Sequence, residues 1–177
     1  MQSRFARIPS AQSVLIALTA FAGAFVSMHS KADVTSNLQV SATVPVGCTI
    51  TTTAVTFGNY EPQGTNAGNP ADAQGAVNVT CTNGSTTQVI LGQGSHADDG
   101  STNGLPLRRM TNGTNFLSYG LFTDSAHAAI WTNESTGGVT HNGTGTPAEL
   151  TVYGRIPAGQ NVPAGNYTDT VQATVVF

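Results

Sequence analysis

The alternation of apolar and polar residues is clearest over residues 34–44. One set of alternate positions is apolar except for Ser36, and the other set holds only threonine, asparagine, glutamine and serine. Because successive side chains of a strand point to opposite faces, this pattern predicts a β-strand with one face to bury. The apolar members are Val34, Leu38, Val40, Ala42 and Val44.

This first strand has two candidate destinations. It could be the first strand of its own domain, or it could complete the core of a neighbouring copy. Pro45-Val46-Gly47 follows it at once and breaks the pattern. The alternation alone leaves both possibilities open.

The rest of the chain shows short alternating runs between turn signals and no convincing helical periodicity. This organisation is typical of an all-β sandwich or barrel in one domain. Asn83-Gly84 predicts a type I′ hairpin turn. Polar, glycine-containing loops are expected over 58–74, 92–104 and 132–146. The expected strands are 48–57, 76–82, 86–91, 105–110, 116–122, 128–131, 150–156 and 167–177.

The last of these strands alternates along most of its length. Its expected inward row is Val171, Ala173, Val175 and Phe177. A well-formed strand that leaves an apolar edge unpaired is an aggregation hazard that natural proteins cover. Residues 34–44 have a suitable length to cover such an edge. The short spacer 45–47 gives them little reach to fold back across their own sandwich.

The first 32 residues have the organisation of a secretory signal peptide. Arg4 and Arg7 precede an apolar run over 14–26, and Ser30-Lys31-Ala32 has small residues at the first and third positions. A retained membrane anchor is the alternative, but the run is shorter than the roughly 20 residues of a comfortable span. We therefore expect a mature chain of residues 33–177.

Removal of the signal peptide leaves an acidic chain with few charges. Three arginines then face all nine acids, which gives a net charge of −6. No basic surface remains for nucleic acid or anionic lipid. Export also places Cys48 and Cys81 in an oxidising compartment, where a disulfide is the expected state. A metal pair is the competing interpretation, but no second Cys-x-x-Cys or histidine pair accompanies it.

Candidate catalytic and metal-binding residues are sparse. His96, His127 and His141 are widely spaced, and we expect them to be solvated. Ser95-His96 near Asp98-Asp99 lies in a glycine-rich loop and lacks a Gly-x-Ser-x-Gly motif, so it does not predict a hydrolase. The same aspartates could hold a weak calcium ion, although a solvated loop is the simpler interpretation. Trp131 is expected in the core, with sugar stacking as the alternative.

Several strings in the second half resemble the spore coat protein U domain. They are Arg108-Arg109-Met110-Thr111, Leu117-Ser118-Tyr119-Gly120-Leu121-Phe122 with a lone Trp131, residues 150–157, and Pro163-Ala164-Gly165-Asn166-Tyr167-Thr168-Asp169-Thr170-Val171. The spacing from Val34 through Cys48 is also similar to pilin subunits of the archaic chaperone–usher class. The resemblance covers essentially the whole mature chain.

The resemblance implies an incomplete immunoglobulin-like β-sandwich that lacks its last strand. It implies a donor strand at 33–46 and a domain at 47–177, with an acceptor groove beside the C-terminal strand. A periplasmic chaperone would fill this groove first, and the N-terminal segment of the next subunit would replace it at an outer-membrane usher.

These observations together predict a structural pilus subunit, secreted through the periplasm to the cell surface, that supports adhesion and biofilm formation. Its expected partners are identical or related pilin subunits, a periplasmic chaperone and an outer-membrane usher. No enzyme activity, cofactor, metal, nucleic acid or small-molecule substrate is expected. The alternatives are a secreted coat protein with the same fold and a sugar-binding tip adhesin.

Overall fold

The structure is a computed structural model that describes residues 30–177. The chain separates into two units, Met1–Ser41 and Ala42–Phe177. All but the last three residues of the predicted signal peptide lie outside the described part. The described residues of the first unit, 30–41, belong to no strand, and all of their side chains are exposed.

The second unit is built from eight strands and two short 3₁₀ turns. The turns are η1 (Thr65–Ala67) and η2 (Ser135–Gly137). No helix within residues 30–177 is long and apolar enough to cross a membrane. The strands are β1 (Cys48–Thr53), β2 (Ala71–Cys81), β3 (Thr86–Leu91), β4 (Arg108–Thr111), β5 (Phe116–Phe122), β6 (Val139–Asn142), β7 (Ala148–Ile156) and β8 (Ala173–Val176).

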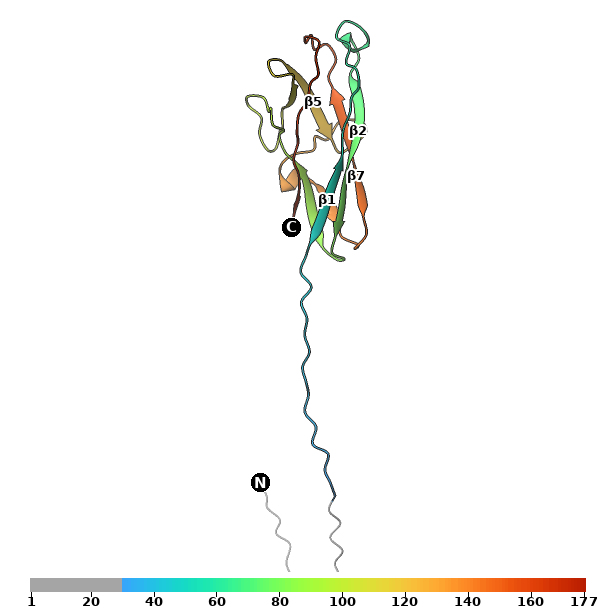
Figure 1. Ribbon diagram of the computed structural model, residues 1–177, viewed down its shortest axis with the longest axis vertical. Helices are drawn as coiled ribbons and strands as arrows, with labels where there is room; N and C mark the ends of the chain where they lie inside the picture. Colours follow the sequence, from blue (N-terminus) through green and yellow to red (C-terminus); the bar gives the residue numbers. More distant parts are fainter. Residues whose placement is uncertain (1–29) are drawn as a thin grey trace, which may run out of the picture. The chain divides into compact units, whose positions relative to one another are not determined.

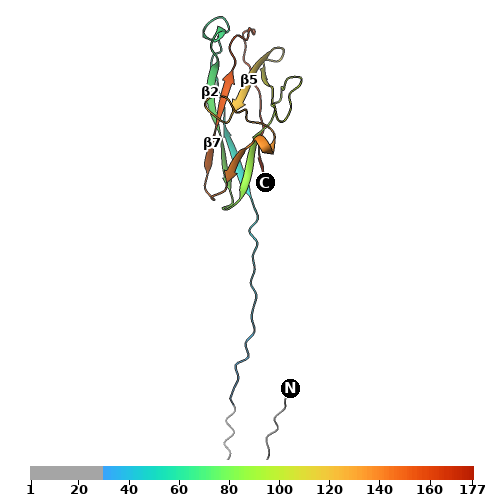
Figure 2. The ribbon, with the colours of Figure 1, turned by 180° about the vertical axis from the view of Figure 1, so that it is seen from behind.

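The strands form two antiparallel sheets that pack as a sandwich (Figure 1). The first sheet has the order β1-β2-β7-β5-β4, and the second has the order β6-β3-β8. The same arrangement is seen from behind in Figure 2. Within the described chain, β1 pairs only with β2 and β8 pairs only with β3, so each sheet ends in an edge strand.

The core lies between the two sheets and includes alternate residues of the central strands. Trp131 is fully buried, and its Nε1 donates a hydrogen bond of 2.8 Å to the Val89 carbonyl. The expectation that this tryptophan is a core residue is therefore confirmed. The main apolar core residues are Val77, Val79, Val89, Leu91, Leu117, Leu121, Trp131, Val152 and Ile156.

Several strand boundaries differ from the sequence predictions. β2 begins at Ala71, inside the expected loop over 58–74, and β6 lies inside the expected loop over 132–146. Both segments are rich in alanine or polar residues, so periodicity gives little sign of them. The expected strand over 128–131 does not form, and only one isolated bridge, between Ile130 and Phe122, lies in this segment.

The hairpin predicted at Asn83-Gly84 is wrong. β2 and β3 belong to different sheets and do not pair, so this turn is a corner between the two layers. Gly84 has φ of 80°, but Asn83 does not have the positive φ that a type I′ turn requires. A single glycine in the left-handed region suffices for the Thr82–Ser85 turn, closed by the Ser85 amide on the Thr82 carbonyl at 3.1 Å.

Candidate assembly groove

An open groove lies along the side of the sandwich where the two edge strands, β1 and β8, face each other. It has a volume of about 1150 Å³. One wall is the end of β1 with the chain that follows it, from Thr52 to Gln63, and the other wall runs from Asn161 to Ala173. Its floor consists of core residues, including Val77, Leu117, Leu121, Val152 and Ile156. These floor residues are already buried, and a further strand between the two walls would close this side of the sandwich.

The lining of the groove ends at Thr52 on β1 and at Ala173 on β8. β1 and β8 contact each other directly. Cys48, which begins β1, and Val176, which pairs with Gln88 near the start of β3, lie outside this lining. The groove is therefore open toward Val162–Val171 and closed toward the C-terminal end of β8.

The predicted acceptor row divides into two pairs. Val171 and Ala173 line the groove and are half-buried. Val175 is half-buried but lies toward the closed end, and Phe177 is 73% exposed. The alternation itself is present, because Gln172 and Thr174 between these residues are exposed. The C-terminal strand is shorter than expected, since only Ala173–Val176 form a ladder.

The side chains of the predicted donor row are exposed in the described part of the chain. Val34 is 98% exposed, Leu38 89%, Val40 86% and Val44 79%, and Ala42 is also exposed. Residues 34–44 form no strand, contrary to the direct prediction from their alternation. A strand needs the hydrogen-bond ladder of a neighbour, and the described chain provides none for this segment.

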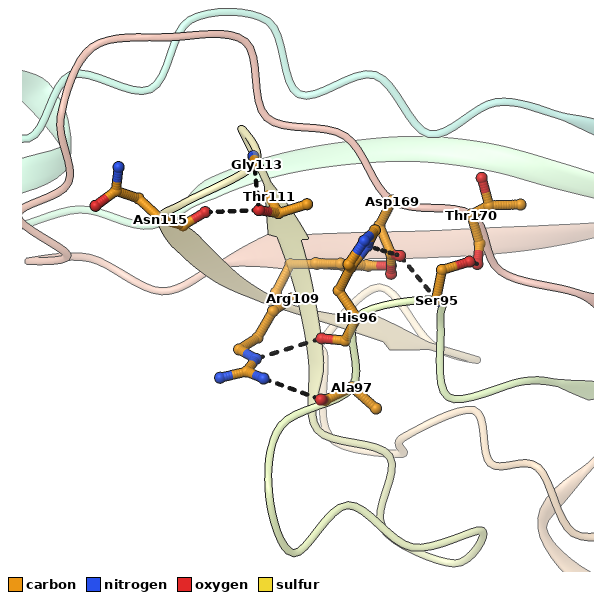
Figure 3. Close-up of polar contacts among 10 residues, drawn as sticks. Ser95, His96, Ala97, Arg109, Thr111, Gly113, Asn115, Asp169 and Thr170 are labelled. Carbon is orange, nitrogen blue, oxygen red and sulfur yellow. Dashed lines mark hydrogen bonds and ion pairs between the residues drawn. The ribbon is translucent and has the colours of Figure 1, made fainter.

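A buried carboxylate anchors the open wall of the groove. The side chain of Asp169 is 2% exposed, and the residue lies one step before Val171 on the inward row. Its Oδ2 accepts a hydrogen bond of 2.7 Å from the Tyr119 hydroxyl, and its Oδ1 accepts one of 2.9 Å from the Ser95 amide. His96 Nδ1 lies 3.2 Å from the same Oδ1 (Figure 3). These contacts fix the groove wall to β5 and to the loop that follows β3.

The environment of Tyr119 keeps its hydroxyl protonated. Burial raises the pKa of this phenol well above its usual range, and the hydrogen bond to the Asp169 carboxylate raises it further. The hydroxyl therefore remains a donor to Asp169 at any physiological pH. Tyr119 also lines the groove, so this hydrogen bond joins two residues of the groove lining.

The polar loop over 92–104 is fastened to β4 by Arg109. Its Nε and Nη2 donate hydrogen bonds of 3.3 and 3.0 Å to the carbonyls of His96 and Ala97 (Figure 3). Its Nη1 lies 2.8 Å from Asp98, and its guanidinium stacks 4.2 Å from the centre of the Phe116 ring. Asp98 is thus engaged by a cation, which speaks against the calcium alternative for this loop.

Arg108 is the most deeply buried charged residue of the described chain. It is 1% exposed and donates to three carbonyls at 2.8 Å each, those of Leu91, Gly92 and Trp131. Burial lowers the pKa of its guanidinium to about 10, so it stays charged at neutral pH. One side chain therefore holds three backbone segments that are distant in sequence.

The expectation that all three histidines are solvated is wrong. His141 is 6% exposed, and the side chain of His127 is 7% exposed with its ring edge-on to Phe122 and Tyr153. Only His96 keeps substantial exposure, at 40% of its side chain. Over residues 30–177 no three histidine, cysteine, aspartate or glutamate side chains cluster as a metal site requires.

A disulfide joins Cys48 and Cys81, as expected from the predicted export. These residues are also the first register pair of the β1–β2 ladder. The bridge therefore lies where the N-terminal segment enters the sandwich.

Asp169 and Tyr119 were not recognised as groove residues from the sequence. The signal that could have found them is the position of Asp169 on the inward row of the strand expected over 167–177. A charged residue among half-buried apolar neighbours requires a buried partner, and tyrosine is a residue type that commonly supplies one.

These features define an all-β sandwich with one open side and an unpaired apolar segment at its N-terminal end. The family model of the Spore Coat Protein U domain matches residues 34–174, and the chain belongs to that family. Protein U of Myxococcus xanthus is 42% identical over 154 residues, which cover 82% of this chain and 86% of that protein.

A solved complex shares the fold. It is the pre-assembly complex of CsuC and CsuE, a chaperone and a tip adhesion subunit of the archaic chaperone–usher Csu pili of Acinetobacter baumannii. The match has a TM-score of 0.54 and 23% identity, and it covers 76% of this chain and 40% of the solved chain. The sandwich of this protein is therefore immunoglobulin-like.

Proposed function

We propose that this protein is a structural subunit of a bacterial surface fibre, polymerised by donation of residues 34–44 into the groove of the next copy. The observation that carries the proposal is a matched pair of features in one chain. Within residues 30–177, the alternating segment 34–44 pairs with no strand, and no strand occupies the groove above the apolar core.

The energetics of such a joint are favourable. Val34, Leu38, Val40 and Val44 are almost fully exposed in the single chain. Their burial at about 1.5–3 kcal/mol each yields roughly 6–12 kcal/mol before the cost of ordering the segment. A main-chain ladder along the free edge of β8 would also satisfy backbone groups that are otherwise unpaired.

The ends of the groove favour one direction for the incoming strand. The chain's own N-terminal segment leaves at Gly47, at the closed end of the groove. A neighbouring domain is better placed at the open end, near Val162. Its donor segment then runs antiparallel to β8, in the orientation that a strand joined to β8 by a hairpin would have. Val171 and Ala173 form the centre of the contact.

Assembly by this route requires the groove to be protected before polymerisation. A periplasmic chaperone and an outer-membrane usher are the partners we infer, by analogy with the chaperone–tip adhesin complex that shares the fold. The finished fibre would lie at the cell surface and support adhesion and biofilm formation. The groove acts by binding a strand, and no catalytic role is proposed for it.

Removal of the donor segment tests the proposal. A chain without residues 33–44 should still bind its chaperone, because its groove is intact, but it should give no fibres in electron micrographs of material sheared from cells. A second chain, with residues 33–44 moved behind Phe177 through a short turn, should fill its own groove and remain monomeric. Long fibres from either chain would refute the donor assignment.

The second candidate function is a component of a cell coat. It is favoured by the match to a family that is named after a spore coat protein. It would use the same strand donation but form a layer. Electron microscopy of the cell surface with and without this chain distinguishes a layer from thin fibres. The sugar-binding alternative loses its main support, because Trp131 is completely buried and cannot stack on a ligand.

A further inference from the structure

The N-terminal segment enters the sandwich at Gly47, which is hydrogen-bonded to Thr82 through both its amide and its carbonyl. The Thr82 amide donates to the Gly47 carbonyl at 2.9 Å, and the Gly47 amide donates to Thr82 Oγ1 at 3.0 Å. The same Oγ1 lies 3.3 Å from the Pro45 carbonyl and 3.2 Å from the Gly47 carbonyl, to either of which it can donate. Next to these bonds lies the Cys48–Cys81 disulfide.

Thr82 is itself tied to the second sheet. Its carbonyl accepts hydrogen bonds from the amide and the hydroxyl of Ser85, at 3.1 and 2.7 Å. Ser85 in turn accepts from the Gly143 amide at 2.8 Å, in the connection between β6 and β7. Gly143 is packed so tightly that a Cβ there would collide with the Thr82 carbonyl and the Ser85 hydroxyl. A force on Gly47 therefore reaches both sheets.

We propose that the Cys48–Cys81 bridge, supported by Thr82, is a mechanical anchor that carries fibre tension from the donor segment into both sheets of the sandwich. This inference rests on the proposed fibre. In such a fibre each subunit is pulled through residues 45–47, because they are the only covalent link between the donated strand and its own domain.

The register of the ladder explains why an anchor is needed there. β1 is an edge strand that pairs with β2 alone. A pull on Gly47 reaches the pair Cys48–Cys81 before any other pair of this ladder. Without a covalent link, only the hydrogen bonds between β1 and β2 would hold β1 against the pull. The disulfide passes the load directly to β2, which pairs over nine register positions with β7.

Native fibres can test this without any substitution. A fibre is held at constant tension in optical tweezers while dithiothreitol is added. The dithiol thiolate attacks one sulfur of the bridge, the other sulfur leaves as a thiolate, and the mixed disulfide resolves to oxidised dithiothreitol and two cysteines. Tension along the S–S bond should accelerate this exchange. We expect fibre elongation or rupture to become at least ten-fold faster between low and high tension, and only in the presence of dithiothreitol.

A reduction rate that is independent of tension, measured by alkylation of the released thiols, would overturn the anchor. So would fibres that elongate at the same rate with and without dithiothreitol. These failures differ from failure of the fibre proposal itself. That proposal fails when the chain without residues 33–44 still forms fibres, whereas the anchor fails in fibres that depend on those residues.

A pair of variants tests the contribution of Thr82. After reduction, its hydrogen bonds to Pro45 and Gly47 are the first that tension must break. Thr82→Val should therefore make reduced fibres break about ten-fold faster under tension, the factor expected for the loss of one or two hydrogen bonds. Thr49→Val is the matched control, because Thr49 is exposed on the adjacent strand and its side chain makes no hydrogen bond within residues 30–177. Equal rates of fibre breakage for the two variants would show that Thr82 does not contribute to the anchor.

Discussion

The substitution Leu38→Asp is the most direct test of how the joint between subunits is stabilised. Leu38 is 89% exposed in the single chain and lies in the middle of the apolar row. Its burial contributes about 1.5–3 kcal/mol, and an unpaired carboxylate in the groove adds a penalty of several kcal/mol. A total of about 5 kcal/mol weakens the joint by between three and four powers of ten.

The assay is the fraction of fibre that dissociates into subunits in a urea series, measured by gel filtration. Gln39→Asp provides the control, because it adds the same charge at the neighbouring position on the outward row of the donor strand. Leu38→Asp fibres should dissociate at clearly lower urea, or fail to assemble, whereas Gln39→Asp fibres should match the unchanged protein. Equal midpoints for Leu38→Asp and Gln39→Asp would refute the assignment of the inward row.

Three further predictions concern the sandwich itself, each measured as the free energy of unfolding in urea. The raised pKa of Tyr119 means that its contribution is complete below the unfolded pKa of about 10 and is lost as pH rises above it. Tyr119→Phe should therefore reduce the loss of stability between pH 10 and 12, and an unchanged slope would contradict this. Gly94→Ala should destabilise more than Gly100→Ala. Both glycines have positive φ, but only at Gly94 would the Cβ strike the Asp169 carboxylate, so equal effects would argue against a tight groove wall. Trp131→Ala should cost about 3–5 kcal/mol, and a smaller loss would indicate that the core collapses around it.

The inward row of the C-terminal segment shows what alternation can predict. Tyr167, Asp169, Val171, Ala173 and Val175 are each half-buried, and the residues between them are exposed. The alternation holds even though only Ala173–Val176 form a ladder. Side-chain direction is a local property of an extended chain, so it can be predicted before the pairing partner is known.

The corner at Asn83-Gly84 shows where local reasoning stops. The same two residues suit a hairpin and a turn between two sheets, because both require only a tight reversal of the chain. Whether the turn forms a hairpin or a corner depends on the strands that pair with β2 and β3. These are β7 and β8, which are far away in sequence. No local signal carries that information.

Buried polar residues were the least predictable part of the site. Arg108 lies in an expected strand and His141 in an expected polar loop, and burial was predicted for neither, yet both are buried. The Nε and Nη2 atoms of Arg108 donate to carbonyls at the end of β3 and of Trp131, while Nη1 is buried without a partner among residues 30–177. Such partners come together only in the folded chain, so the sequence pattern around Arg108 does not reveal them.

The placement of the arginines has a consequence for survival outside the cell. Arg108, Arg109 and Arg155 are the only basic residues of Ala42–Phe177 apart from the histidines. Arg108 and Arg109 lie in β4 and Arg155 in β7, and the guanidinium groups bond to backbone carbonyls, to Asp98 and to Asp72. Trypsin-like proteases cleave after lysine or arginine, and to do so they must bind the surrounding backbone in an extended form that is free of its strand partners. The folded domain should therefore resist digestion by this whole class of enzymes.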